Sequence, residues 1–107
     1  MRGMAKREQV FPRLSAKEAL ILGLLRGAKE MYGLELVAAS GGALKRGTVY
    51  VTLGRMEEKG FIASHQEQEA PAMGGLPRRL YKPTAYGRQL LAASTAMRRR
   101  LMPEFVR

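Results

Sequence analysis

Residues 47–62 hold the side chains of this chain that are best suited to binding chemistry. Val49, Leu53 and Met56 recur at steps of four and three residues, which places them on one buried face of a helix. The other face then carries hydroxyl, methyl and cationic groups, supplied by Thr48, Val51, Thr52, Arg55 and Lys59, with Tyr50 near the boundary. Hydroxyls and methyls can meet base edges in a DNA groove, and cations such as Arg55 can meet phosphates or, alternatively, a guanine. An ordinary solvated helix face is the alternative.

Two basic pairs flank this helix in the sequence. Lys45 and Arg46 precede it, and Arg78 and Arg79 follow a turn-rich loop over residues 70–77. That loop sets two glycines between two prolines, a pattern typical of a turn between strands. Glycines would let its tip approach a sugar-phosphate backbone, where the arginines supply charge. It is not a nucleotide-binding loop, because no Gly-Lys-Ser or Gly-Lys-Thr follows. A plain hairpin turn with solvated arginines is the alternative.

The overall charge favours a polyanionic partner. The chain has 107 residues, with 19 Lys and Arg against 9 acidic residues, all of them Glu, and a net charge of +10. A small domain this basic repels itself unless a polyanion is its usual partner, and nucleic acid is the leading candidate. A basic, merely solvated surface is the alternative.

The composition argues against several other classes. There are no cysteines and one histidine, so we expect no disulfide, no metal site and no cofactor. Ser64 and His65 are neighbours on a predicted strand and would point to opposite faces, so we do not expect an enzyme. No apolar run approaches the roughly 20 residues that span a bilayer. Because the first eight residues also lack the apolar core of a secretory signal, we expect a cytoplasmic protein without a membrane partner.

The elements that position these residues can be read from caps and periodicity. Ser15 and Glu18 form a capping box that opens a helix over residues 15–26. A second helix is predicted over residues 32–40, and the third begins near Arg46 or Gly47. Gly60 suits the left-handed residue that ends the third helix. Strands over 61–69 and 78–82 follow, so we predict a mainly α fold with a two-stranded antiparallel hairpin.

A last helix of about 18 residues is predicted after Thr84. It carries a narrow seam at alternating steps of three and four residues, formed by Leu90, Ser94, Met97 and Leu101. We interpret this seam as a homodimer interface. The predicted organisation is a flexible basic arm over 1–13, a winged helix-turn-helix over 14–83, and a dimerisation helix and tail over 84–107.

Over residues 14–92 the chain resembles the PadR-like transcriptional regulators. The resemblance rests on Met31-Tyr32-Gly33, Thr48-Val49-Tyr50, Leu53, Met56-Glu57, Lys59-Gly60-Phe61-Ile62, Tyr81, Thr84 and Gly87. It implies a winged helix-turn-helix repressor that dimerises through its C-terminal helix and binds an inverted repeat. It also implies that Tyr32, Thr48, Tyr50, Arg78 and Arg79 lie on the DNA side.

The sequence departs from the family pattern in two places. Gly54 stands where the family usually has a larger, often basic or polar residue. The chain also ends soon after one C-terminal helix, so any small-molecule effector would bind in a small pocket at the dimer interface. The rings of Tyr50 and Tyr81 have a second interpretation, as half-buried members of the core.

Our main hypothesis is therefore a dimeric, sequence-specific repressor that binds double-stranded DNA. The alternatives are a winged helix that acts as a protein-interaction or adaptor module, and a non-specific DNA-binding protein.

Overall fold

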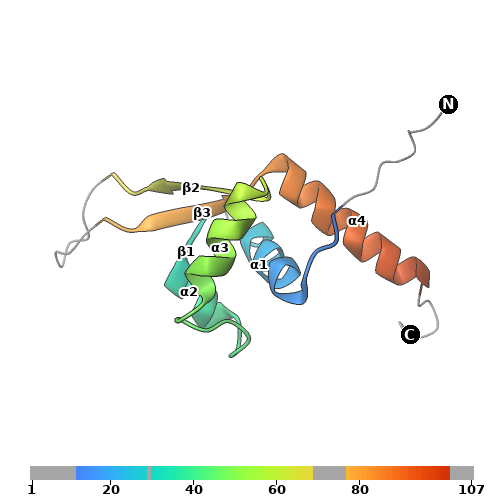
Figure 1. Cartoon of the computed structure of the whole chain (residues 1–107), viewed down its shortest axis with the longest axis horizontal. Helices are drawn as coiled ribbons and strands as arrows, with labels where there is room; N and C mark the ends of the chain where they lie inside the picture. The colour runs from blue at the N-terminus through green and yellow to red at the C-terminus, as the bar shows by residue number, and fades with distance from the viewer. Residues whose placement is uncertain (1–11, 29, 69–76, 102–107) are drawn as a thin grey trace.

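The computed structural model describes residues 12–28, 30–68 and 77–101 (Figure 1). Its helices are α1 (Ala16–Arg26), α2 (Gly33–Ala39), α3 (Val49–Glu58) and α4 (Ala85–Leu101). Its strands are β1 (Met31–Tyr32), β2 (Ile62–Gln66) and β3 (Arg79–Pro83). Most of the predicted basic arm and of the predicted wing loop lies outside the described residues.

The sheet has three antiparallel strands in the order β1-β3-β2, not the two that the sequence predicted. β2 and β3 form the expected hairpin, in a register that sets Ile62 opposite Pro83. The added strand is β1, in which Tyr32 pairs with Leu80 of β3. Tyr32 was predicted as the first residue of the second helix. It instead completes this strand, and Gly33 begins α2. β1 thereby fastens the start of α2 to the hairpin.

α1 begins with the predicted capping box. The Ser15 hydroxyl accepts a hydrogen bond from the Glu18 amide at 3.1 Å, and the Ser15 amide donates to Glu18 Oε1 at 2.9 Å. These two bonds satisfy amides that the first turn of a helix leaves without partners. The helix runs to Arg26, so its predicted extent is confirmed.

The core lies where α1, α2 and α3 meet the sheet and the first half of α4. Its buried side chains are Ile21, Leu22, Leu25, Leu36, Leu44, Val49, Leu53, Met56, Phe61, Ile62, Tyr81, Leu90 and Leu91. The predicted inward face of α3 is therefore confirmed, since Val49, Leu53 and Met56 are all within it. The Tyr81 ring is also buried, as the second interpretation of that residue expected.

α3 begins two to three residues later than the sequence predicted. Lys45 and Arg46 lie in a turn before it, where the Lys45 carbonyl accepts hydrogen bonds from the amides of Thr48 and Val49. The helix ends as predicted: Gly60 has a φ of 83°, and the Phe61 amide donates to the Met56 carbonyl at 2.9 Å. A positive φ costs glycine nothing, so Gly60 turns the chain directly into β2.

α4 packs on the core through its first half and leaves the body of the molecule through its second (Figure 1). A Cβ at Gly87 would collide with the Phe61 carbonyl, so glycine allows the helix to lie directly on that backbone. Leu90, predicted in the dimer seam, is only 2% exposed and belongs to the core of its own chain. Ser94 is half-buried, Met97 is exposed, and the side chain of Leu101 lies outside the description. The part of α4 left open for a partner is therefore shorter than the predicted seam.

Within the described ranges, no helix has both the length and the apolar character to cross a lipid bilayer.

Candidate nucleic-acid interface

The outer face of α3 is open along its length. Val51 is 54% exposed and Tyr50 50% exposed, while Thr52 is half-buried. The remaining predicted contact residues of this region are exposed: Lys45, Arg46, Thr48 and Arg55. Because Val51 is two positions from Leu53, helix geometry turns it away from the core. The predicted face is thus accessible in the described part of the chain.

Tyr50 lies at the edge of this face, with its ring against the start of α2. A Cβ at Gly33 would fall 2.5–2.7 Å from three atoms of the Tyr50 ring and hydroxyl, so a side chain at position 33 would displace the ring. Glycine at position 33 therefore allows the ring to lie on the α2 backbone. Tyr50 is neither a core residue nor a free side chain, and this explains why the sequence needs Gly directly after Tyr32.

A hollow of about 350 Å³ opens between α2, the start of α3 and the loop end of the hairpin. Its lining residues are Tyr32, Gly33, Leu34, Glu35, Ala38, Tyr50, Arg78 and Arg79. Four of the residues predicted on the DNA side, Tyr32, Tyr50, Arg78 and Arg79, are thus brought together at one place. They come from segments up to 47 positions apart.

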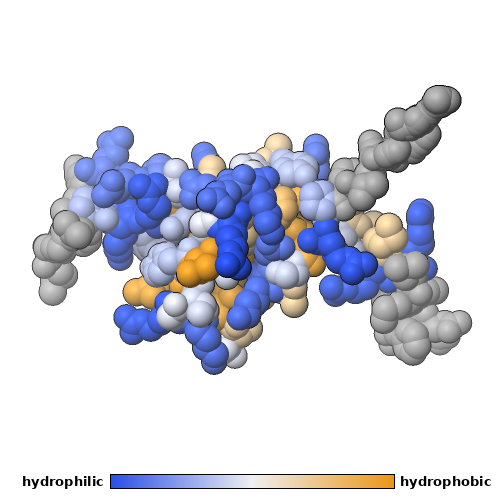
Figure 2. Space-filling view, viewed as in Figure 1, coloured by the Kyte–Doolittle hydropathy of each residue, from blue (hydrophilic) through white to orange (hydrophobic). Residues whose placement is uncertain are grey.

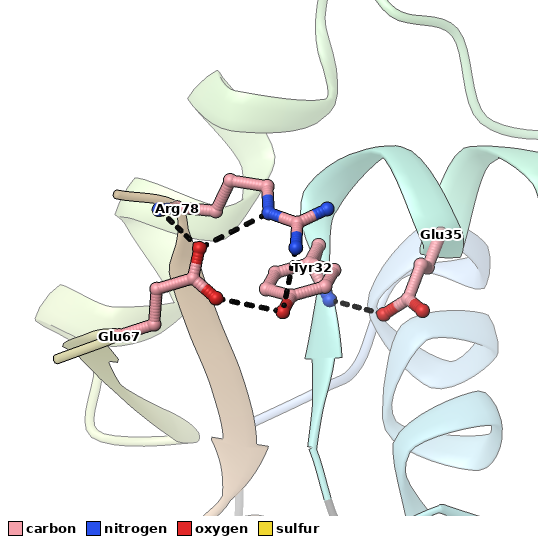
Figure 3. Close-up of polar contacts among 4 residues, drawn as sticks. All are labelled: Tyr32, Glu35, Glu67 and Arg78. Carbon is pink, nitrogen blue, oxygen red and sulfur yellow. Dashed lines mark hydrogen bonds and ion pairs between the residues drawn. The ribbon is translucent and has the colours of Figure 1, made fainter. Parts of the chain in front are cut away.

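A three-residue network joins β1 to the hairpin at this hollow (Figure 3). The Tyr32 hydroxyl donates to Glu67 Oε1 at 2.9 Å, and Arg78 Nη2 donates to the Tyr32 hydroxyl at 3.1 Å. The backbone amide and Nε of Arg78 both donate to Glu67 Oε2, at 2.9 and 3.1 Å. The Arg78 guanidinium also stacks on the Tyr32 ring, 3.9 Å from its centroid. We call these three residues the wing-base network.

The residues of the wing-base network shift one another's pKa values in the directions that keep Glu67 ionised and Tyr32 and Arg78 protonated. The Arg78 amide, together with hydrogen bonds from Tyr32 and the Arg78 side chain, holds the pKa of Glu67 below its usual value. Donation to Glu67 raises the pKa of the Tyr32 hydroxyl, and the same carboxylate raises the pKa of Arg78. Arg78 is therefore held at the loop end of the hairpin by a carboxylate. The sequence had suggested a free phosphate-binding side chain at this position.

A second chain of hydrogen bonds joins the hairpin to α3. Arg79 Nη1 donates to the Ser64 hydroxyl at 3.0 Å, and that hydroxyl donates to Glu57 Oε2 at 2.8 Å. His65 has a different partner, Glu30 Oε2 at 3.0 Å. Ser64 and His65 thus have separate partners, in keeping with their expected opposite directions on the strand.

Lys59, the residue that caps the C-terminal end of α3, joins this helix to α1. Its ammonium lies 2.7 Å from Oε2 of Glu18, a carboxylate that is only 6% exposed. Burial raises the pKa of Glu18, but hydrogen bonds from Lys59 and from Ser15 outweigh it, and the pKa lies below the usual value. The sequence predicted Lys59 as one of the outward cations of this helix, available to phosphates, whereas in the structure it is paired with Glu18.

The sequence reasoning did not predict that Glu57 and Glu67 anchor the hairpin, and it gave Glu18 only the role of a helix cap, not that of a partner for Lys59. One signal could have drawn attention to them. The chain has 9 acidic residues against 19 basic ones, so a carboxylate within a predicted element has a cation as its most available partner.

On the α1 side of α3 the surface is cationic. A hollow of about 450 Å³ is lined by Arg13, Leu14, Ser15, Lys17, Glu18, Thr52, Arg55 and Lys59. The hollow on the α1 side is therefore lined by more cations than the hollow on the α2 side.

No cluster of three or more potential metal ligands of the His, Cys, Asp and Glu types occurs among the residues that the structure covers.

Three helices, a small antiparallel sheet and an exposed third helix define the winged helix-turn-helix class, here with a further helix after the hairpin. The sequence model of the transcriptional regulator PadR-like family matches residues 21–93. The chain belongs to that family, so the family prediction is confirmed.

Solved structures agree with this assignment. A PadR family transcriptional regulator from Eggerthella lenta has 29% identity and a TM-score of 0.67, over 81% of this chain and 75% of that one. A PadR family transcription regulator from Clostridium difficile has 28% identity and a TM-score of 0.67, over 87% of this chain and 100% of that one. Bacillus subtilis PadR in complex with operator DNA has 24% identity and a TM-score of 0.62, over 73% of this chain and 45% of that one. No curated protein sequence matches the chain significantly.

Proposed function

We propose that the protein is a sequence-specific DNA-binding regulator that acts as a dimeric repressor on an inverted-repeat operator. The observation that supports this most directly is the open outer face of α3, with the loop end of the hairpin on one side and a cationic surface on the other. In a helix-turn-helix, the second helix of the motif enters the major groove and flanking cations hold the backbone. The net charge of +10 fits such a partner.

The fold shared with Bacillus subtilis PadR supports DNA as the partner, since that protein was solved in complex with operator DNA. In the proposed complex Thr48, Val51 and Thr52 face base edges, while Lys45, Arg46 and Arg55 contact phosphates. Arg78 sets the position of the hairpin through the wing-base network, and Arg79, exposed at the same hollow, contacts a phosphate.

We place the dimer contact on the second half of α4. Met97 is 54% exposed there, and the side chains from residue 95 to residue 100 are all exposed. A symmetric dimer would present two copies of α3, which matches an operator with two inverted half-sites. An effector, if the protein responds to one, would bind at this contact.

The proposal is tested by selecting bound duplexes from a random pool and measuring their affinity at several salt concentrations. Enrichment of an inverted repeat, with binding that weakens steeply as salt rises, is the expected result. Binding without any enriched sequence would leave only the non-specific alternative. Salt-independent or absent binding would favour the adaptor alternative.

A matched pair of variants tests the orientation of α3. Gly54 lies in α3 and Gly23 in α1, and at both positions a Cβ would have no atom of the described chain within 4 Å. Gly54→Glu and Gly23→Glu change the net charge equally, but only the first places a carboxylate on the proposed DNA face. Two like charges 4 Å apart in water repel by about 1 kcal/mol, so Gly54→Glu should weaken operator binding about fivefold.

Gly23→Glu should bind like the unchanged protein, with circular dichroism showing that both variants fold. Equal losses in the two variants would mean that α3 does not face the duplex.

A further inference from the structure

Large apolar side chains are exposed at the proposed interface. Among the described residues five large hydrophobic side chains are exposed, and three of them, Leu34, Tyr50 and Val51, lie in α2 and α3. Their exposed fractions are 45%, 50% and 54%. Figure 2 shows hydrophobic surface over α2 and the start of α3, bordered by hydrophilic side chains. We call these three residues the apolar patch.

The patch continues across two helices. Leu34 and Tyr50 line the same hollow, together with Ala38. The Tyr50 ring rests on Gly33, directly before Leu34, so it lies against the α2 backbone. Val51 follows Tyr50 and lies on the side of α3 opposite Leu53. The patch therefore covers the α2 side and the centre of the outer face at the start of α3.

Cations border this apolar surface. Lys45 and Arg46 lie in the turn before α3, and Arg55 lies one helical turn after Val51. Arg79 lines the same hollow as Leu34 and Tyr50. Apolar surface framed by positive charge suits a partner with apolar groups between two lines of negative charge. The major groove of DNA is such a partner, because thymine methyl groups lie between the two phosphate backbones.

The first half of α3 offers few other ways to read bases. Residues 48–53 contain no Asn, Gln, Arg or Lys, the side chains that make bidentate hydrogen bonds to adenine or guanine. Only the hydroxyls of Thr48, Tyr50 and Thr52 are available there. Sequence discrimination by this half of the helix must therefore depend largely on apolar contacts.

From these observations we infer that the apolar patch recognises the C5-methyl groups of thymines in each operator half-site. The inference rests on the proposed function and adds which base feature is read and by which residues. Leu34 and Tyr50 receive a methyl group at the hollow between α2 and α3, and Val51 contacts another from the centre of the helix.

Uracil substitution tests this directly, because uracil differs from thymine only by that methyl group. In the duplex enriched by selection, each thymine is replaced in turn by deoxyuridine, and affinity is measured by fluorescence anisotropy with the unchanged protein. One or two positions in each half-site should lose affinity about fourfold, as expected from uncovering one buried methyl group. Thymines outside the half-sites should tolerate the change and serve as the control.

Two variants assign the contact to the patch. Val51→Ala should weaken binding to the thymine duplex and remove the uracil effect at one position, since the contact is already lost. Arg55→Ala should weaken binding to all duplexes alike and leave the uracil effect unchanged, since phosphate contacts do not depend on base identity.

The failure of this inference differs from failure of the proposed function. If an inverted repeat is enriched but uracil is tolerated at every position, methyl recognition is wrong and the regulator remains. A uracil effect that persists in Val51→Ala, in Leu34→Ala and in Tyr50→Ala would likewise overturn the assignment to the patch. If no sequence is enriched, the proposed function fails and this inference fails with it.

Discussion

Replacing Gly54 by alanine should stabilise the protein. Gly54 lies inside α3 and is not one of the glycines with a positive φ, and a Cβ there would meet no atom of the described chain within 4 Å. The added methyl therefore causes no clash and removes backbone freedom from the unfolded chain. Alanine is favoured over glycine in a helix interior by about 0.5–1 kcal/mol.

For a domain of this size, that gain corresponds to a rise in melting temperature of about 2–6 °C. Thermal unfolding followed by circular dichroism measures it, at one fixed protein concentration because a dimer would make the midpoint concentration-dependent. Gly23→Ala is the matched control, since Gly23 lies inside α1 with equally open surroundings. The two variants should be stabilised to a similar degree.

A melting temperature that falls in Gly54→Ala but rises in Gly23→Ala would refute this reasoning. It would mean that another part of the protein, such as a second subunit, covers α3 at Gly54. The open face on which the proposed function depends would then be occupied without DNA.

Three further predictions concern contacts between elements. Glu18→Gln should destabilise the protein by about 1.5–3 kcal/mol in urea unfolding, because a buried acceptor of charge-assisted hydrogen bonds is weakened. The folded-state pKa of Glu18 is depressed, so its contribution is complete above the unfolded value near 4.5 and is lost as the pH falls through the folded value. Stability should accordingly depend less on pH below 4.5 in Glu18→Gln, and an unchanged acid profile would contradict this. Gly33→Ala should destabilise by about 1 kcal/mol because its Cβ displaces the Tyr50 ring, and Tyr50→Ala in the same chain should recover most of the loss; additive losses would show that the ring is not the obstacle. Glu67→Gln should weaken operator binding without changing the contacted bases, because it loosens Arg78 at the loop end of the hairpin; unaltered affinity would remove the wing-base network from the binding model.

The local structure could be predicted where a short stretch of sequence contains the whole cause. The capping box needs only Ser15 and Glu18, and the end of α3 needs only Gly60 and its neighbours. The buried face of α3 follows from the period of the helix. For this reason the extent of α1, the inward direction of Val49, Leu53 and Met56, and the family itself were all predictable.

The prediction from sequence failed for features whose cause lies in a distant segment of the chain. β1 has only two residues, too few for an alternating pattern, and exists because Leu80 and Tyr81 offer it a free edge. Leu90 has the sequence spacing of a coiled-coil interface residue, but it is buried in the hydrophobic core of its own chain. Periodicity identifies an apolar side chain and cannot say which surface buries it.

The candidate site shows the same division. The sequence by itself determined which residues face outward from α3, because helix geometry fixes that once the inward face is known. Only the tertiary structure decided which cations are paired with partners inside the chain: Arg78 is held by Glu67 and Tyr32, and Lys59 by Glu18. These partners are 11 to 46 positions apart, and their pairing depends on how β1, the hairpin and α1 come together. A charge in a sequence has no partner until folding brings one within a few ångströms, so folding decides which cations remain free for another molecule.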